Sequence, residues 1–251
     1  MVCQGTNRGI KMTIIGELLS TLSYEAPVRD IRQGPFQTAV LTRNCGLAST
    51  PHDPGPHYSR TPVTEAGLLM EKDVLALARM ALSPSPLEAA IGMATINSLI
   101  DVDEQRCTEL NAGDLLPKKG EGKKVAIIGH FPFVPKLRRV VRELWVIERN
   151  PQEGDFDEAE ADRLVPQADV VGITGTAFTN QTIKRLLSLC KPNAYVVVLG
   201  GTAPLSPVLF DYGVDAISGT LVTEPETVLC CVSQGATFRQ IKGVRLLTME
   251  R

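Results

Sequence analysis

Residues able to bind ligands or move protons stand at the ends of two short apolar runs. The run VAIIG ends at Gly129 and is followed by His130, and the run LWVIE ends at Glu148. An imidazole can serve as a metal ligand or as a general acid or base. Glu148 follows Gly129 at about the spacing of the ribose-binding carboxylate in dinucleotide-binding folds. We therefore take these three residues as candidate ligand contacts, with a plain surface carboxylate as the alternative for Glu148.

Two further apolar runs end in glycines, hydroxyl groups and an amide. GITGTAFTNQT brings Thr176 and Asn180 to the expected start of a helix, and LGGTAPLSP carries Gly200, Thr202 and Pro204. The free N–H groups and the positive dipole end of a helix start favour an anionic or carbonyl-bearing ligand. These residues are predicted ligand contacts. The alternatives are that Asn180 caps its helix and that the stiff loops are plain connectors.

The turn after the first run does not match a dinucleotide-binding loop. Gly129 is followed by His130, Phe131 and Pro132, where that fingerprint places further glycines. Bulky or ring-locked residues would obstruct the approach of a pyrophosphate to the backbone. The chain also has no GxSxG motif and no glycine-rich loop followed by Lys-Ser or Lys-Thr. NAD binding, GxSxG hydrolysis and P-loop phosphoryl transfer therefore lack their residues.

Two side chains are candidate metal ligands. Cys45 lies in NCGLAST, and a thiolate there with the His130 imidazole nearby would suit a soft or borderline metal. The alternative is that Cys45 is a small buried apolar residue. His52 and His57 match no compact zinc signature, so they are interpreted as exposed loop histidines.

The remaining thiols and carboxylates have simpler interpretations. The cysteines of two apolar helices are expected to be buried thiols: Cys190, Cys230 and Cys231. The connection after Glu148 is rich in acidic residues, which are interpreted as a solvated face: Glu153, Asp155, Asp157, Glu158, Glu160 and Asp162.

The second half of the chain alternates between apolar strand-like runs and helical segments. Short runs rich in Val and Ile are typical of strands that are buried on both faces of a parallel sheet. They predict strands at 125–129, 144–148, 169–175, 195–201 and 214–219, with helices from about Pro135, at 181–190, near Ser206 and at 225–233. Thr223 and Glu226 are predicted to form a capping box, and Gly235 a left-handed helix end. An open doubly wound sheet binds its ligands at the carboxyl ends of its strands.

The first half has a different pattern. A helix is expected at 14–23, an antiparallel meander at 28–50 and a proline-rich loop at 51–64. A helix at 67–82 and a second one that begins at Pro86, with Ser85 and Glu88 as a capping box, then cover one face of the meander. Residues 101–123 are polar and are predicted to be a linker. The chain thus divides into an α+β domain at 12–105 and a doubly wound α/β domain at 120–251.

The totals narrow the class of protein. The chain has 251 residues, 43% of them hydrophobic, with 26 basic and 28 acidic side chains. With these numbers the chain has no excess of positive charge that would attract nucleic acid. No apolar stretch is long enough to span a membrane. The first residues lack a signal-peptide pattern, so we expect a cytoplasmic protein. Met1 and Met12 are both candidate start residues, and self-association stays open.

The chain also resembles a known family. The segments VAIIGHFPF, ADVVGITGTAFTNQTIKRLL and GGTAPLSPVLFDYGVDAISG resemble a domain of unknown function labelled "putative heavy-metal chelation". CGLAST and PLEAAIGMATINSLI resemble the companion domain that precedes it in that family. The resemblance implies a domain similar to the N-terminal domain of enolases fused to a Rossmann-like domain, with the site in the cleft between them.

Three functions follow as expectations. The first is a cytoplasmic protein that binds a small molecule, a heavy metal or a metal chelate in the interdomain cleft. The alternative is an enzyme that uses a nucleotide-bearing cofactor such as S-adenosylmethionine, with Glu148 on the ribose. The third is a purely structural subunit of a larger assembly. Fold resemblance alone transfers no chemistry, so enolase activity is not expected.

Overall fold

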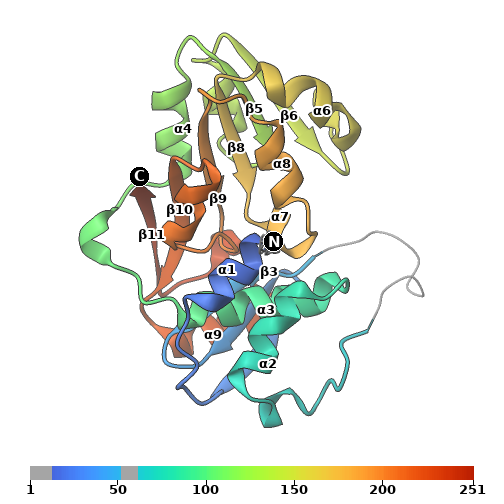
Figure 1. Ribbon diagram of the computed structural model, residues 1–251, viewed down its shortest axis with the longest axis vertical. Helices are drawn as coiled ribbons and strands as arrows, with labels where there is room; N and C mark the ends of the chain where they lie inside the picture. The colour runs from blue at the N-terminus through green and yellow to red at the C-terminus, as the bar shows by residue number, and fades with distance from the viewer. Residues whose placement is uncertain (1–12, 52–61) are drawn as a thin grey trace, which may run out of the picture.

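The protein is built around two β-sheets. The computed structural model describes residues 13–51 and 62–251. Their strands form a three-stranded sheet and an eight-stranded sheet, which occupy the lower and upper halves of Figure 1. The interpretation of His52 and His57 as loop histidines, and the choice between Met1 and Met12, concern residues outside these ranges.

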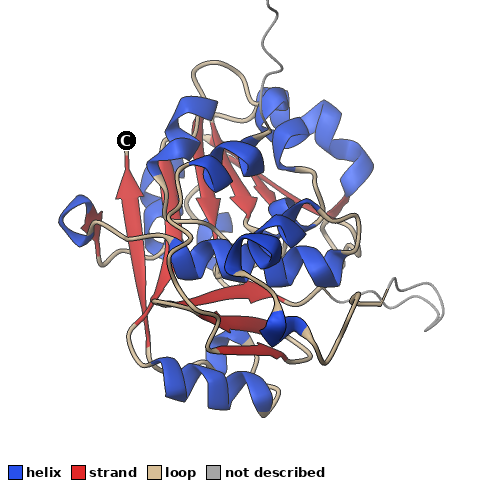
Figure 2. Cartoon of the chain, turned by 60° about the horizontal axis from the view of Figure 1, so that its bottom comes forward, coloured by secondary structure: helices blue, strands red, loops and turns tan. Residues whose placement is uncertain are grey.

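The small sheet is the predicted antiparallel meander. Its strands are β1 (Asp30–Gln33), β2 (Gln37–Leu41) and β3 (Cys45–Ser49), paired in that order. The short turn between β2 and β3 is closed by a hydrogen bond from the N–H of Thr42 to the carbonyl of Asn44, 2.9 Å long. Figure 2 shows these three strands below the large sheet.

Both faces of the meander are covered by helices. Successive side chains of a strand point to opposite faces, so Val40 and Ala48 pack in the core beside α3 (Pro86–Leu99). Ala39 and Leu47 pack on the other face against α9 (Pro225–Ser233), which comes from the far end of the chain. The expectation that helices cover only one face was therefore wrong.

The helices of the first half begin where polar side chains can cap them. After α1 (Ile14–Ser20), the predicted helix at 67–82 is broken into a 3-10 turn (Leu69–Glu71), α2 (Val74–Arg79) and a second 3-10 turn (Met80–Leu82). The break occurs because the carboxylate of Asp73 accepts a 2.7 Å bond from the N–H of Ala76 and starts α2 afresh.

Neither predicted capping box forms. Ser85 and Pro86 do occupy the first positions of α3, but the carboxylate of Glu88 accepts from the N–H of Thr64 and the hydroxyl of Ser83. The N-cap position of α9 belongs to Glu224 instead of Thr223. Gly235, just after α9, has the predicted left-handed backbone, with φ of 76°.

The large sheet is mostly parallel. Its strands are β4 (Cys107–Thr108), β5 (Lys124–Ile128), β6 (Glu143–Glu148), β7 (Phe156–Asp157), β8 (Val170–Thr174), β9 (Tyr195–Leu199), β10 (Ala216–Val222) and β11 (Val244–Glu250). They lie in the order β4-β11-β10-β9-β8-β5-β6-β7. The five predicted strands are confirmed and are parallel to one another. The order β6-β5-β8-β9-β10 is that of a doubly wound sheet whose switch point lies between β5 and β8.

Two features of this sheet were not predicted. Strand β11 pairs antiparallel with β10 and carries β4 at the sheet edge. The predicted linker at 101–123 contains α4 (Ala112–Gly120), whose Leu115 and Leu116 are almost fully buried. Two of the polar residues of this segment, Lys118 and Lys119, lie in the last turn of α4, where positive charge complements the helix dipole.

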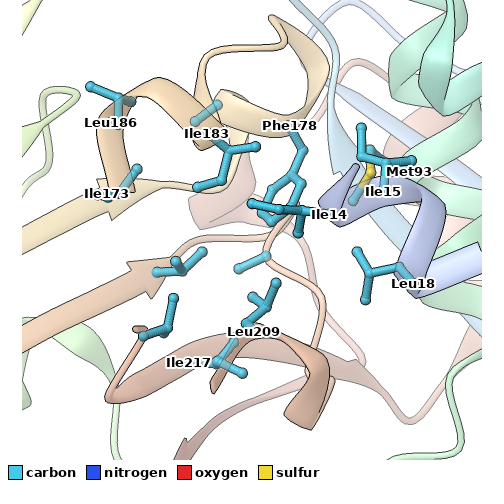
Figure 3. Packing of buried hydrophobic residues seen from close by; sticks show 14 of the residues in the cluster. Ile14, Ile15, Leu18, Met93, Ile173, Phe178, Ile183, Leu186, Leu209 and Ile217 are labelled. Atoms are coloured by element: carbon cyan, nitrogen blue, oxygen red, sulfur yellow. The ribbon is translucent and has the colours of Figure 1, made fainter. Parts of the chain in front are cut away.

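Helices cover both faces of the large sheet. On one face α4 and α5 (Val134–Arg138) pack against Val125 and Ile127. On the other face α6 (Ala161–Leu164), α8 (Ile183–Leu189) and a 3-10 helix (Pro207–Tyr212) share a core with Ala126 and Ile147. That core continues into the first half of the chain, and Figure 3 shows Ile14 beside Phe178 of α7 (Thr176–Thr179). Within the described residues, no helix combines the length and apolarity that crossing a membrane requires.

Candidate functional site

Two adjoining pockets lie at the carboxyl ends of the parallel strands. The small pocket has a volume of about 260 Å³ and lies around the ends of β5 and β6. The large pocket has a volume of about 690 Å³ and lies around the ends of β8, β9 and β10. Phe131, Thr174 and Thr176 line both pockets, so the two spaces meet beside the switch point of the sheet.

The small pocket brings together most of the residues predicted from the first three strand ends. Its lining includes Gly129, His130, Glu148, Thr176 and Asn180. Gly129 has φ of 103°, and a Cβ there would come within 3.2 Å of Phe131 and Thr174. The turn therefore requires glycine for its own geometry.

Glu148, at the end of the neighbouring strand β6, forms a hydrogen bond with the backbone of this turn. One carboxylate oxygen accepts a 2.9 Å bond from the N–H of His130, and the other accepts a 2.8 Å bond from the N–H of Arg149. Both oxygens are thus engaged by backbone donors. A further role of Glu148 toward a ligand stays a prediction.

The imidazole of His130 is held by a carboxylate that was not expected to matter. Nδ1 of His130 lies 2.9 Å from Oδ2 of Asp155, which also accepts from the N–H of Gln152. The side chain of Asp155 is only 2% exposed, so its assignment to a solvated face was wrong. A carboxylate can only accept, so a neutral imidazole in this position has its proton on Nδ1 and its lone pair on Nε2. This pairing is common for histidines that bind metals or act as bases.

Asn180 and the nearby threonines form hydrogen bonds with one another. The side-chain oxygen Oδ1 of Asn180 accepts hydrogen bonds from the N–H and, at 2.6 Å, from the hydroxyl of Thr182, which precedes α8. The hydroxyls of Thr174 and Thr176 lie 3.0 Å apart where the two pockets meet. The N-cap residue of α8 is Thr182, without a side-chain cap bond, and Asn180 ends α7, so the alternative that Asn180 caps the start of its helix was wrong. Asn180 lines the small pocket.

The large pocket is walled by both halves of the chain. Ser49 of the small sheet faces it together with Gly200, Gly201 and Thr202 of the loop after β9. Gly200 has φ of 109°, and a Cβ on Gly201 would come within 2.8 Å of the Phe238 ring. Side chains on these two residues would be strained or crowded, so the glycines keep this wall of the pocket made of backbone.

The lining of the large pocket is apolar with scattered hydroxyls. The rings of Phe131 and Phe133 stack with their centroids 5.2 Å apart, and Phe238 adds a third ring. Among the residues described there, Arg239 is the one with an ionised side chain, and no Asp, Glu, His or Cys lines the pocket. This pocket therefore offers no side chain of the usual metal-ligand types.

Thr202 joins the two sheets. Its hydroxyl accepts a 2.9 Å bond from the N–H of Ser49, and its carbonyl accepts from the side chain of Asn97, which also bonds Leu47. Thr202 is 1% exposed. The predicted residue Pro204 is buried and lines neither pocket.

The structure does not bring Cys45 to His130. Cys45 is 5% exposed in a cluster with Val228 and Ile241, and it lines neither pocket. Desolvation, with smaller effects of nearby Asp30 and Glu226, raises the pKa of its thiol to about 12. A protonated thiol is a poor metal ligand. Within the described part of the chain, no group of three His, Cys, Asp or Glu side chains could hold a metal ion.

The other thiols differ in exposure. Cys190 was predicted to be buried and is half-buried. Desolvation, with a smaller effect of Asp215, raises the pKa of its thiol to about 11. Cys230 is exposed, so its assignment as a buried thiol was wrong, and Cys231 is half-buried.

Some lining residues escaped the sequence analysis. Asn111 stands at the N-cap position of α4, and Phe238 with Arg239 follows the last predicted helix. Asn before an amphipathic segment is a helix-start signal that could have revealed α4. Phe238 and Arg239 carry no such signal, because only the folded chain brings them to the strand ends.

Comparison with known proteins gives a consistent assignment. Residues 111–250 match the model of the DUF364 family and residues 15–100 match that of the DUF4213 family, both described as "Putative heavy-metal chelation". An uncharacterized protein of Methanocaldococcus jannaschii is 27% identical over 191 residues, which cover 73% of this chain and 74% of that protein.

Two solved structures show the same fold. A DUF364 protein of unknown function from Desulfitobacterium hafniense superposes with a TM-score of 0.83 at 23% identity. One from Pyrococcus horikoshii superposes with a TM-score of 0.81 at 22% identity. In both comparisons 95% of this chain and 98% of the other are covered.

Proposed function

This chain belongs to the DUF364 family, and we propose that it binds one small organic molecule in the large pocket, with any heavy metal entering as a chelate of that molecule. The observation that carries this proposal is the pocket itself. Its volume of about 690 Å³ lies within the usual range of small-molecule sites, roughly 300–1,000 Å³. It opens at the strand ends where doubly wound sheets bind ligands, and Ser49 closes it from the other half of the chain.

The donor atoms favour a chelate over a bare ion. A tightly held heavy metal needs several soft or borderline side-chain donors. The described residues offer no such group, and the Cys45 thiol stays protonated at neutral pH. An organic chelator brings its own donors, so the protein has only to accommodate the complex. The residues of ranges 13–51 and 62–251 therefore do not fit a metal ion held by their side chains alone.

The test is native mass spectrometry with elemental analysis of protein purified without added chelator. We expect an adduct of about one organic molecule per chain, with any metal in the same stoichiometry. Thr220 lines the large pocket, so Thr220→Phe should fill part of the space and remove the adduct. The double variant His52→Ala/His57→Ala should keep it. A clean apo mass, or a metal that is lost only when His52 and His57 are replaced, would contradict the proposal.

A second candidate rests on the small pocket. It lies at the switch point of the sheet, where doubly wound folds bind nucleotides, and Glu148 stands at the end of the next strand. An adenosyl cofactor there would stabilise the fold by about 2.7 kcal/mol at 100 times its dissociation constant. Thermal unfolding with S-adenosylmethionine measures this directly. An unchanged midpoint with this and related adenosyl compounds would exclude the enzyme of that type.

A further inference from the structure

We infer that the ligand of the large pocket is an amphipathic organic acid, with a carboxylate, phosphate or sulfonate group beside a flat apolar body. This inference rests on the proposed function, because it concerns the same pocket. It adds the chemical class of the ligand, which follows from the charges and rings that line the space.

The ionised side chain among the described lining residues of the large pocket is positively charged. Arg239 is exposed and lines the pocket, and none of the ion pairs among the described residues involves it. No carboxylate is among the described residues of the lining. A guanidinium presents a planar fork of donors that matches an oxoanion. A ligand with an acidic group would therefore find a partner, and a cationic ligand would find none.

The start of α4 adds donors to the same space. Asn111, Ala112 and Gly113 line the pocket, and an α-helix leaves its first N–H groups without acceptors inside the helix. The side chain of Asn111 donates to Asp114 and does not cap the helix. Asp114 is the nearest acidic residue in that turn, and its charge is engaged by Lys136, whose Nζ lies 2.6 Å away. The field at this end of the pocket therefore favours an anion.

A buried hydroxyl also lacks a partner. Oγ1 of Thr220 is buried and accepts or donates no hydrogen bond within the described chain, although Thr220 lines the large pocket. Leaving such a group unpaired costs about 1–3 kcal/mol. Since almost none of this oxygen is exposed, the polar groups of the pocket that a ligand can reach are those of Arg239 and the start of α4.

The rest of the lining suits a flat apolar body. Phe131 and Phe133 stack with an interplanar angle of 13°, and Phe238 and Leu247 add further apolar surface. Aromatic side chains contribute large apolar contact areas and bind flat ligands well. The combination of these rings with Arg239 and the start of α4 points to an acid with a planar apolar part.

Two dyes that differ in charge test this inference. The anionic probe is 8-anilinonaphthalene-1-sulfonate, and the neutral probe is N-phenyl-1-naphthylamine, which has the same ring system without the sulfonate. We expect the anionic probe to bind the wild-type chain at least tenfold more tightly. Arg239→Gln should weaken the anionic probe about tenfold and leave the neutral probe unchanged. Lys242→Gln, an exposed lysine on the same segment, is the matched control and should change neither.

The outcomes separate this inference from the proposed function. Equal binding of the two probes, with no effect of Arg239→Gln, would overturn the acidic class while leaving a small-molecule pocket. Binding of neither probe, or binding that persists unchanged in Thr220→Phe, would count against the pocket itself. Circular dichroism of each variant ensures that dye binding reports the folded protein.

Discussion

The side chain of Asp155, only 2% exposed, lies 2.9 Å from Nδ1 of His130. This contact fixes the tautomer and the orientation of an imidazole that lines the small pocket. Glu148 holds the backbone N–H of the same histidine. His130 is therefore fixed by one carboxylate at its backbone and by another at its ring, as a residue with a chemical role would be.

Replacing Asp155 by alanine should destabilise the fold. The change removes the acceptor of Nδ1 of His130 and of the N–H of Gln152, and a hydrogen bond to a charged group contributes about 1.5–3 kcal/mol. Urea unfolding measures the difference. Glu153→Ala, an exposed carboxylate of the same connection, should stay within about 0.5 kcal/mol of wild type. Equal effects of the two substitutions would contradict the contact.

Two threonines of the large pocket should respond oppositely to replacement by valine. Thr202→Val removes the acceptor of the Ser49 N–H and should cost about 1–3 kcal/mol. Thr220→Val removes a buried hydroxyl that has no partner in the described chain, so stability should be unchanged or higher. The two changes are matched in volume. A comparable loss in both variants by urea unfolding would show that the Thr202 contact does not tie the sheets together.

The free energy of unfolding should fall in alkaline solution. Burial raises the pKa of Cys45 to about 12 and that of Cys190 to about 11, above the ordinary value of 9.0. Above pH 9 the unfolded chain releases these protons while the folded chain keeps them, so stability is retained below pH 9 and lost above it. Each thiol contributes a slope of about 1.4 kcal/mol per pH unit within its window.

Urea unfolding of Cys45→Ala between pH 8 and 10.5 should therefore show a shallower decline than wild type. Identical slopes would indicate that the Cys45 thiol ionises freely in the folded protein. Native-state alkylation at pH 8 offers an independent check, because exposed Cys230 should react well before Cys45.

The segment that looked like a linker should prove essential for stability. Leu116 in α4 is fully buried against the large sheet, so Leu116→Ala should cost about 2–5 kcal/mol. Leu82, which is 46% exposed, is the control, and its replacement by alanine should change little. If both substitutions have a small effect in urea unfolding, residues 112–120 contribute little to the stability of the fold, as expected of a linker.

Much of the fold could be predicted from local pattern. The five apolar runs became parallel strands because residues such as Val125 and Ile127, and Ala126 between them, must be buried on opposite faces of one sheet. The meander followed from short strands punctuated by turn residues. Strand β11 and helix α4 were missed because their burial depends on the rest of the sheet and their own patterns are mixed with charge.

The two pockets lie at the strand ends named in the sequence analysis, and only part of their lining was predicted. The rule that ligands bind at the carboxyl ends of parallel strands placed Gly129, Thr176 and Gly200 correctly along one edge. It could not show that this edge holds two pockets, or that Thr202 serves mainly to join the sheets. Partners of that kind lie far apart along the chain, as Ser49 and Thr202 do.

The sequence by itself determined most of the elements, their alternation and the sheet edge at which the two pockets lie, since these depend on residue periodicity and turn chemistry. The tertiary structure alone decided which side chains meet there. The side chain of Asp155 is buried next to His130, and Cys45 is buried among residues of the small sheet and α9. Arg239 and the start of α4 line the same pocket. The physical reason is that burial and electrostatic surroundings are set by contacts between distant segments, which no local pattern contains.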